Sequence, residues 1–220
     1  MAMCEHCITG VSHEGTPEGT FTRIGGIDCY VAAPPGEHDT TKILLFLPDA
    51  LGVLSPNSQL LADSFARSGY RTVMVDYFAG DPVPSELAFT GRHEGFSLDA
   101  WHARQPTDLV LARTRAAAVV TAAHPTFLKA PEDLERYRAL AEAPLLLNTC
   151  EVDPPFPPEA QKVADEILGG GKYAPGYERT YWPGCTHGFA VRGDLSNPDV
   201  KAGMEGAFKA TLGFLKKYFV

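Results

Sequence analysis

Two late segments carry residue types that could perform hydrolytic chemistry. Glu151-Val152-Asp153 follows an apolar run, and Cys185-Thr186-His187-Gly188 lies between a strand-like run and the last helical segment. A carboxylate that holds a histidine ring can make the imidazole a general base, which removes a proton from an attacking group. We therefore expect Asp153 and His187 to act as an acid and a base on neighbouring late loops.

Buried strands must deliver these two residues to one edge of a sheet. The continuous apolar runs at residues 43–47, 72–75 and 145–149 are typical of strands covered on both faces of a parallel sheet. A further strand is expected at 178–181, and the segment after it delivers His187. Helical spacing is found at residues 58–68, 131–141, 158–168 and 200–218. The run at 43–47, the helix at 58–68 and the run at 72–75 form a β-α-β unit, right-handed by default.

The remaining segments are less regular. Strand-like runs at 20–24 and 27–33 meet at Gly25-Gly26, which predicts a hairpin. Residues 80–95 are rich in proline and glycine and predict a long surface loop, and helical pieces at 96–105 and 107–115 are separated by Pro106. Residues 116–123 fit either a helix end or a strand. No linker marks a second domain, so residues 1–220 are expected to form a single one.

Composition excludes several classes of function. The chain has 220 residues and a formal net charge of −8, which argues against a nucleic-acid partner. No apolar run is long enough to span a bilayer, and the N-terminus lacks the pattern of a signal peptide, so a cytoplasmic location without a membrane partner is expected. The five cysteines show no disulfide pattern. Cys4-x-x-Cys7, even with His6 and His13 nearby, lacks a second ligand pair, so we expect no metal and no cofactor.

Five motifs, in order along the chain, give a resemblance to a known family. They are Leu47-Pro48-Asp49-Ala50-Leu51-Gly52, Asp76-Tyr77-Phe78-Ala79-Gly80-Asp81, Ala123-His124-Pro125-Thr126-Phe127, Cys150-Glu151-Val152-Asp153 and Cys185-Thr186-His187-Gly188-Phe189-Ala190-Val191-Arg192. The chain resembles the dienelactone hydrolase family, most closely its fungal members. That resemblance implies an α/β-hydrolase fold, a mostly parallel sheet with helices on both faces. It also implies an enzyme that opens small lactones and esters with a Cys (or Ser) nucleophile, an Asp and a His.

The resemblance assigns roles by position. Asp153 matches the triad acid and His187 the general base, in the chain order that follows a nucleophile in this fold. Asp49 falls where the family has an acidic residue beside the nucleophile, and the Ala50 N–H would contribute to the oxyanion hole. Tyr77 and Arg192 match positions near the substrate's carboxylate, which an arginine fork can hold bidentately. The expected partner is accordingly a small, anionic lactone or ester.

The nucleophile itself is not found. The family places it in a G-x-C-x-G or G-x-S-x-G elbow, and residues 116–123, where the elbow belongs, read Ala-Ala-Ala-Val-Val-Thr-Ala-Ala. A strand, elbow and helix need roughly 30 residues, which this joint lacks. We therefore expect the elbow strand and its helix to be missing, and the sheet to close around the gap with residues 118–123 recruited as a strand. Cys150, expected to be buried, and Cys185, constrained by its loop, are poor substitutes.

Several residues have a simpler interpretation beside the functional one. His93, His102 and His124 are expected to be surface or loop histidines. Tyr77 and Trp101 could equally line a pocket or pack in the core. Asp153 could merely cap a turn before its two prolines, and Arg192 could form only a surface ion pair with Asp194 or Asp199.

Three hypotheses for function follow. The first is a dienelactone-hydrolase-like hydrolase of small lactones or carboxylic esters, monomeric or homodimeric. The second is a catalytically impaired homologue that binds a small molecule through Asp49, Tyr77 and Arg192. The third is a truncated isoform, which lost an exon-sized segment carrying the nucleophile from an active parent.

Overall fold

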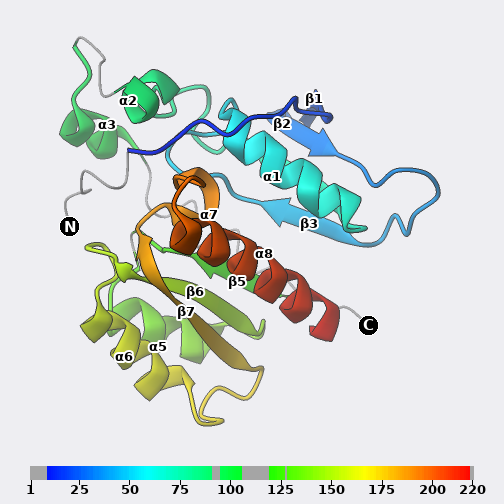
Figure 1. The fold of residues 1–220 in the computed structure, drawn as a ribbon. Coiled ribbons are helices and arrows are strands. Elements are labelled where there is room, and N and C mark those ends of the chain that lie inside the picture. The colour runs from blue at the N-terminus through cyan, green and yellow to red at the C-terminus, as the bar shows by residue number, and fades with distance from the viewer. Residues whose placement is uncertain (1–8, 91–94, 106–118, 127, 219–220) are drawn as a thin grey trace. The chain divides into compact units, whose positions relative to one another are not determined.

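The computed structural model describes residues 9–90, 95–105, 119–126 and 128–218. These residues form two compact units, one within residues 9–105 and one within residues 119–218. In Figure 1 the N-terminal unit runs from blue to green and the C-terminal unit from green to red. The single domain expected over residues 1–220 stays a prediction.

The N-terminal unit opens with the predicted hairpin. Strands β1 (Thr20–Ile24) and β2 (Ile27–Ala32) pair antiparallel, with Ile24 opposite Ile27. Gly25 and Gly26 join them with φ of 58° and 84°, values that a two-residue hairpin turn requires and that glycine adopts without a steric penalty.

The predicted β-α-β unit completes this sheet. Strands β3 (Ile43–Phe46) and β4 (Arg71–Val75) are parallel and are joined through helix α1 (Pro56–Arg67). Strand β2 pairs antiparallel with the other edge of β4, so the strand order is β1-β2-β4-β3. Helix α1 packs its small residues Ala62 and Ala66 into a core with Tyr30 and Met74.

Strand β3 differs from its prediction. The run at 43–47 is expected to be buried on both faces, but Ile43 is 51% exposed and Leu45 is 46% exposed. Ile43 and Leu45 lie two residues apart and so point to the same face of the sheet, and β3 stands at the end of the strand order, where among the described residues its outer edge pairs with no strand. The apolar run of β3 is typical of a central strand, although β3 is an edge strand.

The loop predicted at residues 80–95 contains a helix, so that prediction is wrong in part. Helix α2 (Ser85–Thr90) begins directly after Pro84, whose carbonyl accepts from the Leu87 N–H. A proline just before a helix does not interrupt it, because the first turn needs no N–H there. Helix α3 (Leu98–Arg104) agrees with the helical piece at 96–105, whereas the piece at 107–115 lies outside the described residues.

The C-terminal unit is a three-layer α/β structure (Figure 1). Its strands β5 (Val120–Ala123), β6 (Leu145–Val152) and β7 (Tyr177–Thr186) are parallel and lie in that order. Helices α5 (Glu132–Leu140) and α6 (Pro158–Leu168) pack over Leu145 and Leu147 on one face. The long helix α8 (Pro198–Tyr218) packs on the other face, where Thr211 accepts a hydrogen bond from Asn148.

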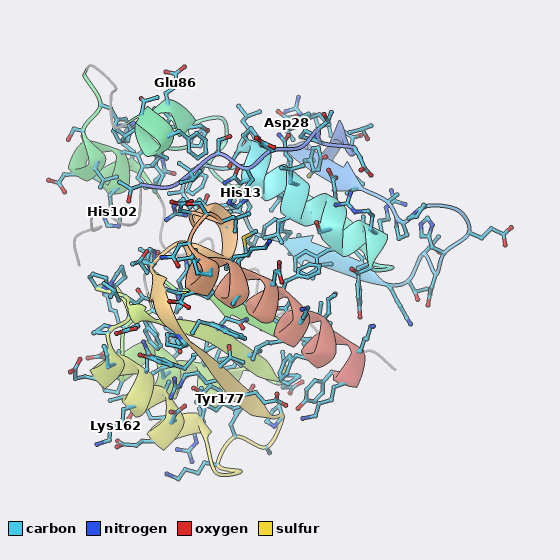
Figure 2. All side chains as sticks on the ribbon, viewed as in Figure 1. His13, Asp28, Glu86, His102, Lys162 and Tyr177 are labelled. Atoms are coloured by element: carbon cyan, nitrogen blue, oxygen red, sulfur yellow. The ribbon has the colours of Figure 1, made fainter. Side chains whose placement is uncertain are left out.

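An ion pair and a hydrogen bond connect helix α6 to the first residues of strand β7. The Tyr177 hydroxyl (labelled in Figure 2) donates to Asp165 Oδ1 at 2.9 Å, and Arg179 Nε donates to the same oxygen at 2.9 Å. Burial disfavours a charged Asp165, but the hydrogen bonds from Arg179 and Tyr177 outweigh it and lower the pKa of the Asp165 carboxyl. The pair fixes the register between the helix and the strand that carries the His187 loop.

The strand expected at the joint is present. Residues 120–123 form β5 and pair with β6. Within the described residues the hydrogen-bonded strands form a sheet of four and a sheet of three, one in each unit, and the closure of one sheet around the gap stays a prediction. Within the described residues β3 pairs with β4 alone along its parallel edge, and β5 pairs with β6 alone.

Candidate active site

Asp153 lies directly after the carboxyl end of β6. Its side chain is buried, with the residue 2% exposed, and Oδ1 accepts from the Phe156 N–H at 3.3 Å. The Phe156 N–H also reaches the Asp153 carbonyl at 3.1 Å, so the Asp153-Pro154-Pro155 turn is closed on itself. Asp153 does cap a turn, as the simpler interpretation held, and its carboxylate has a second partner as well.

That second partner is His187, directly after the carboxyl end of β7. The His187 N–H donates to Val152 O at 2.8 Å, which fixes the loop against β6. His187 Nδ1 lies 2.7 Å from Asp153 Oδ1, and the two side chains are 2% and 0% exposed. The carboxyl ends of neighbouring parallel strands meet at one edge, which explains why two residues 34 apart in sequence come together. In the neutral tautomer of His187 that donates from Nδ1 to this carboxylate, Nε2 presents its lone pair.

Thr126 faces that lone pair. Its Oγ1 lies 3.2 Å from His187 Nε2, within hydrogen-bond reach. Thr126 follows β5, which is parallel to β6 and β7 in this unit, and the residue is half-buried. Sequence reasoning missed Thr126, although it lies within the Ala123–Phe127 motif. The only signal for Thr126 in the sequence was its position just after a possible strand. That strand was itself uncertain, because residues 116–123 also fit the end of a helix.

His124 is buried, contrary to the expected surface or loop position. It is 6% exposed, and its ring meets the His187 ring edge to face, with centroids 4.9 Å apart. Its φ of 40° is unusual for a residue other than glycine. Burial first, and then the nearby His187 and Arg192, hold the pKa of His124 well below its ordinary value. Among the described residues its Nε2 has no hydrogen-bond partner.

Arg192 is also buried rather than on the surface. It ends the short helix α7 (Phe189–Arg192), too brief to show helical spacing in the sequence, and is 2% exposed. Its guanidinium packs on Gly188, where an added Cβ would lie 2.8 Å from Cζ. Gly188 has a φ of 91°, so both the backbone and the close approach require glycine there. The structure thus places Arg192 beside the His187 loop.

The remaining predicted site residues belong to the N-terminal unit. Asp49 and Ala50 follow β3, and the Asp49 carboxylate accepts from the Leu51 N–H at 3.0 Å. Tyr77 follows β4, and its hydroxyl donates to Pro48 O at 2.5 Å. The structure therefore brings Asp49, Ala50 and Tyr77 to one edge of this unit, and Asp153, His187 and Arg192 to one edge of the other.

Trp101 packs in the core of the N-terminal unit. It is 1% exposed, its ring lies 5.3 Å from that of Phe78, and its Nε1 donates to Asp81 O at 2.7 Å. These contacts are those of a tryptophan packed in the core. The second tryptophan, Trp182, lies on β7 against helix α8, where its ring approaches Gly206.

The two cysteines considered as substitutes are poorly suited to attack a substrate. Cys150 and Cys185 are both 0% exposed. Burial, followed by the charge of Asp153, raises the pKa of the Cys150 thiol, and burial, followed by the charge of Asp199, raises that of Cys185. A thiol reacts as the thiolate, so a raised pKa makes each group a weak nucleophile.

No metal site is found among the described residues, where no group of three or more His, Cys, Asp or Glu side chains could hold an ion. The Cys4-x-x-Cys7 pair lies outside them. Likewise, none of the helices in the described part of the chain is long and apolar enough to cross a membrane.

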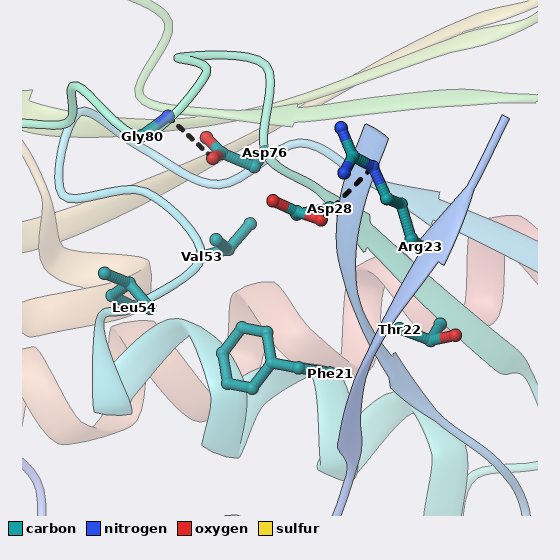
Figure 3. Close-up of a pocket in the computed structure, with 8 residues that line it drawn as sticks. All are labelled: Phe21, Thr22, Arg23, Asp28, Val53, Leu54, Asp76 and Gly80. Carbon is teal, nitrogen blue, oxygen red and sulfur yellow. Dashed lines mark hydrogen bonds and ion pairs between the residues drawn. The ribbon is translucent and has the colours of Figure 1, made fainter. Parts of the chain in front are cut away.

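A surface hollow of about 540 Å³ lies in the N-terminal unit (Figure 3). Its lining residues are Phe21, Thr22, Arg23, Asp28, Val53, Leu54, Asp76 and Gly80. Asp76 is engaged by the Gly80 N–H at 2.8 Å, and Arg23 lies 3.8 Å from Asp28 with both side chains exposed. The hollow includes none of the residues predicted to be catalytic or substrate-binding, so its geometry does not make it the active site.

Comparisons with known proteins bear on this arrangement. No family model matches the chain. The chain is 32% identical over 218 residues to Dienlactone hydrolase 2 of Gibberella moniliformis, covering 93% of this chain and 90% of that protein. It is 30% identical over 246 residues to Hydrolase pyvD of Aspergillus violaceofuscus, covering 96% and 95%.

Solved structures extend the likeness to the fold. A Klebsiella pneumoniae structure that carries the name dienelactone hydrolase matches with a TM-score of 0.69 at 14% identity, over 91% of this chain and 99% of that one. A thermophilic esterase of Thermogutta terrifontis matches with a TM-score of 0.56 at 15% identity, over 91% and 94%. At these identities the solved structures show that the chain has the fold of α/β-hydrolases.

Proposed function

The chain belongs to the dienelactone hydrolase family of α/β-hydrolases, and we propose that it hydrolyses small lactones or carboxylic esters with Asp153 and His187 as its acid–base pair. One observation carries the proposal. His187 Nδ1 and Asp153 Oδ1 lie 2.7 Å apart with both side chains buried. A buried carboxylate that orients an imidazole is the arrangement that lets histidine act as a general base.

The geometry sets the direction of each proton transfer. Asp153 accepts from Nδ1–H, so Nε2 is free to take a proton from a hydroxyl group that attacks the substrate carbonyl. The imidazolium that forms is stabilised by Asp153 and then donates its proton to the leaving oxygen. For a lactone, the leaving oxygen stays attached to the product as a hydroxyl group.

The remaining site residues take supporting roles in the proposal. The family resemblance implies an oxyanion-hole role for the Ala50 N–H, with Asp49 beside it, and that role stays a prediction. Arg192, buried beside the His187 loop, would hold a carboxylate of an anionic substrate, a task suited to the planar guanidinium fork, and the role of Tyr77 stays a prediction from the family resemblance. The monomeric or homodimeric state and the cytoplasmic location stay predictions from the sequence.

We also propose that the chain lacks the nucleophile elbow with its strand and helix. The alignment with Hydrolase pyvD spans 246 positions and includes 96% of this chain's 220 residues, about 211, so about 35 positions (246 against 211) have no counterpart here. A strand, elbow and helix occupy roughly 30 residues, which is close to that difference. The outer edges of β3 and β5, unpaired among the described residues, also support the loss of a strand.

A second function, binding without turnover, is favoured by the same missing segment. A chain that keeps a buried arginine beside the His187 loop but has no elbow could hold a small anion without hydrolysing it. A third possibility, a truncated form of an active parent, is tested by the coding DNA. An in-frame segment with a G-x-C-x-G motif at the joint would identify that parent.

Hydrolysis of p-nitrophenyl acetate and of a small lactone tests the proposed function. The wild type, His187→Ala and the loop variant His38→Ala are compared, because His38 bonds only locally, to Gly36 O. We expect His187→Ala to lower kcat/KM by about a hundredfold or more, the usual contribution of a general base, while His38→Ala stays close to wild type. Equal activity in His187→Ala would refute the acid–base pair.

The binding alternative has its own result. A wild type that hydrolyses neither substrate, yet binds a small carboxylate saturably and loses that binding in Arg192→Ala, would favour a binding homologue. Calorimetric titration measures the binding, and circular dichroism checks that each variant is folded.

A further inference from the structure

We propose that Thr126 supplies the nucleophilic oxygen of this site, in place of the elbow residue that the sequence lacks. The proposal rests on the proposed function, since it gives His187 a group to activate. Nothing in the family resemblance assigns a role to Thr126. The observation that carries it is the 3.2 Å contact between Thr126 Oγ1 and His187 Nε2.

Three consecutive parallel strands deliver the three groups. Thr126 lies three residues beyond the last residue of β5, Asp153 one beyond β6, and His187 one beyond β7. Because β5, β6 and β7 are neighbours in that order, their carboxyl ends form one edge. The sheet therefore places a hydroxyl, a carboxylate and an imidazole together without the elbow.

The hydrogen-bond directions are those of a nucleophile with its base. In a neutral imidazole, donation from His187 Nδ1 to Asp153 at 2.7 Å leaves Nε2 as the acceptor, and the Thr126 hydroxyl then donates to it. A hydroxyl becomes a useful nucleophile when a base within about 3.2 Å can take its proton, and that base is in turn oriented by a third group. Thr126, His187 and Asp153 meet both conditions.

The turn that carries Thr126 is anchored from the side of β5. The His124 N–H donates to Asn148 O at 2.9 Å, and the His124 ring packs on His187 and on Phe189, with centroids 4.9 Å and 5.8 Å away. The positive φ of His124, followed by Pro125, turns the chain sharply before Thr126. Backbone held in an unusual conformation by its surroundings is a frequent feature of functional sites.

The buried His124 ring also suits the charge that forms. Its pKa is held low by burial first and then by His187 and Arg192, so His124 stays neutral while His187 takes the proton. A second imidazolium at this distance would oppose proton transfer to His187.

The reaction balances without a cofactor. Thr126 Oγ1 forms a bond to the carbonyl carbon as its proton moves to His187 Nε2. The carbon–oxygen bond to the leaving group then breaks, and that oxygen takes the proton from Nε2, which leaves an acyl ester on Thr126. Water attacks this ester and passes a proton to Nε2, and the proton returns to Oγ1 as the carboxylic acid departs.

A covalent phosphonate probe combined with kinetics tests the assignment. The protein is treated with an alkyl fluorophosphonate, and the adduct is located by peptide mass spectrometry. The variants are Thr126→Val, which keeps the shape but removes the hydroxyl, and Thr126→Ser, which keeps the hydroxyl. We expect the wild type and Thr126→Ser to carry the adduct on residue 126, and Thr126→Val and His187→Ala to carry none.

Hydrolysis of p-nitrophenyl acetate supplies the second measurement. Thr126→Val is expected to lose at least about a hundredfold in kcat/KM, and Thr126→Ser to stay within about tenfold of wild type. A residue that only positions His187 would also slow the reaction when replaced, but it would never carry the adduct. The location of the adduct therefore separates the two roles.

The possible failures are distinguishable. If Thr126→Val hydrolyses like the wild type while His187→Ala does not, the proposed function holds and the Thr126 assignment is overturned. An adduct on another residue, or none in a turning-over wild type, overturns it as well. A wild type without turnover but with an adduct on Thr126 refutes the hydrolase and supports the nucleophile, whereas neither turnover nor adduct refutes both.

Discussion

The rings of His124 and His187 meet edge to face, with their centroids 4.9 Å apart and their planes at 71°. Both residues are buried, and the charge of Arg192 also lowers the pKa of His124. Two protonated imidazoles cannot be accommodated cheaply at this distance, because like charges and burial both disfavour the second proton. The C-terminal unit therefore folds around a neutral His124.

The first prediction concerns stability against pH. The pKa of His124 is lowered by folding, whereas a histidine in an unfolded chain has a pKa of about 6.5. Above that pH both states are neutral at this residue. Below it only the unfolded state takes the proton, so the free energy of unfolding falls as the pH decreases, by up to about 1.4 kcal/mol per pH unit. Urea unfolding between pH 5 and 8 measures this slope.

The matched variant is His124→Gln, which removes the titrating ring. Its stability is expected to fall less steeply below pH 6.5 than that of the wild type. His187 and Arg192 face position 124 in both proteins, so their own contributions largely cancel in the comparison. Identical slopes for the two proteins would show that His124 does not control the acid sensitivity.

The second prediction concerns the buried thiols. Cys150 and Cys185 are fully buried, and burial raises the pKa of each thiol. We expect a thiol reagent at pH 8 to modify them only after unfolding, as shown by peptide mapping. Cys150→Ala and Cys185→Ala should keep kcat/KM within about threefold of wild type, since neither thiol attacks the substrate. Alkylation of native Cys150 with loss of hydrolysis would contradict the assignment.

The third prediction concerns the edge of β3. An exposed apolar edge strand is a template for association with another chain. Ile43→Thr with Leu45→Thr is expected to reduce aggregation, measured by light scattering, and to change the free energy of unfolding by no more than about 0.5 kcal/mol. Leu140→Thr on helix α5 is the control, because Leu140 is 52% exposed but lies on a helix. An equal reduction by Leu140→Thr would show that exposure alone, and not the strand edge, drives association.

The sequence predicts most elements of each unit because their signals are local. Alternation and turn glycines fix the β1–β2 hairpin, and helical spacing fixes α6 at the residues observed. The exposure of Ile43 could not be predicted, because an apolar run does not reveal whether its strand stands at the centre or at the edge. Helix α7 spans only four residues and so shows no period.

The candidate site was predictable where it coincides with family motifs. Asp153 and His187 are matched by position, and their 2.7 Å hydrogen bond is what neighbouring parallel strands should produce. The contacts of Thr126 and His124 depend on β5 lying beside β6, a tertiary fact that the alanine-rich segment before them does not encode. Histidine also has no strong preference for surface or core, so the burial of His124 could not be predicted from the sequence.

The central claim is that Asp153 and His187 work as one unit in hydrolysis, and a double-mutant cycle on kcat/KM tests it most directly. Asp153→Asn, His187→Ala and the double variant are compared with the wild type on p-nitrophenyl acetate, with circular dichroism to confirm folding. Members of a catalytic unit are strongly non-additive, so we predict that the double variant loses no more activity than His187→Ala alone. Losses that multiply, or a wild type no faster than His187→Ala, would contradict the account.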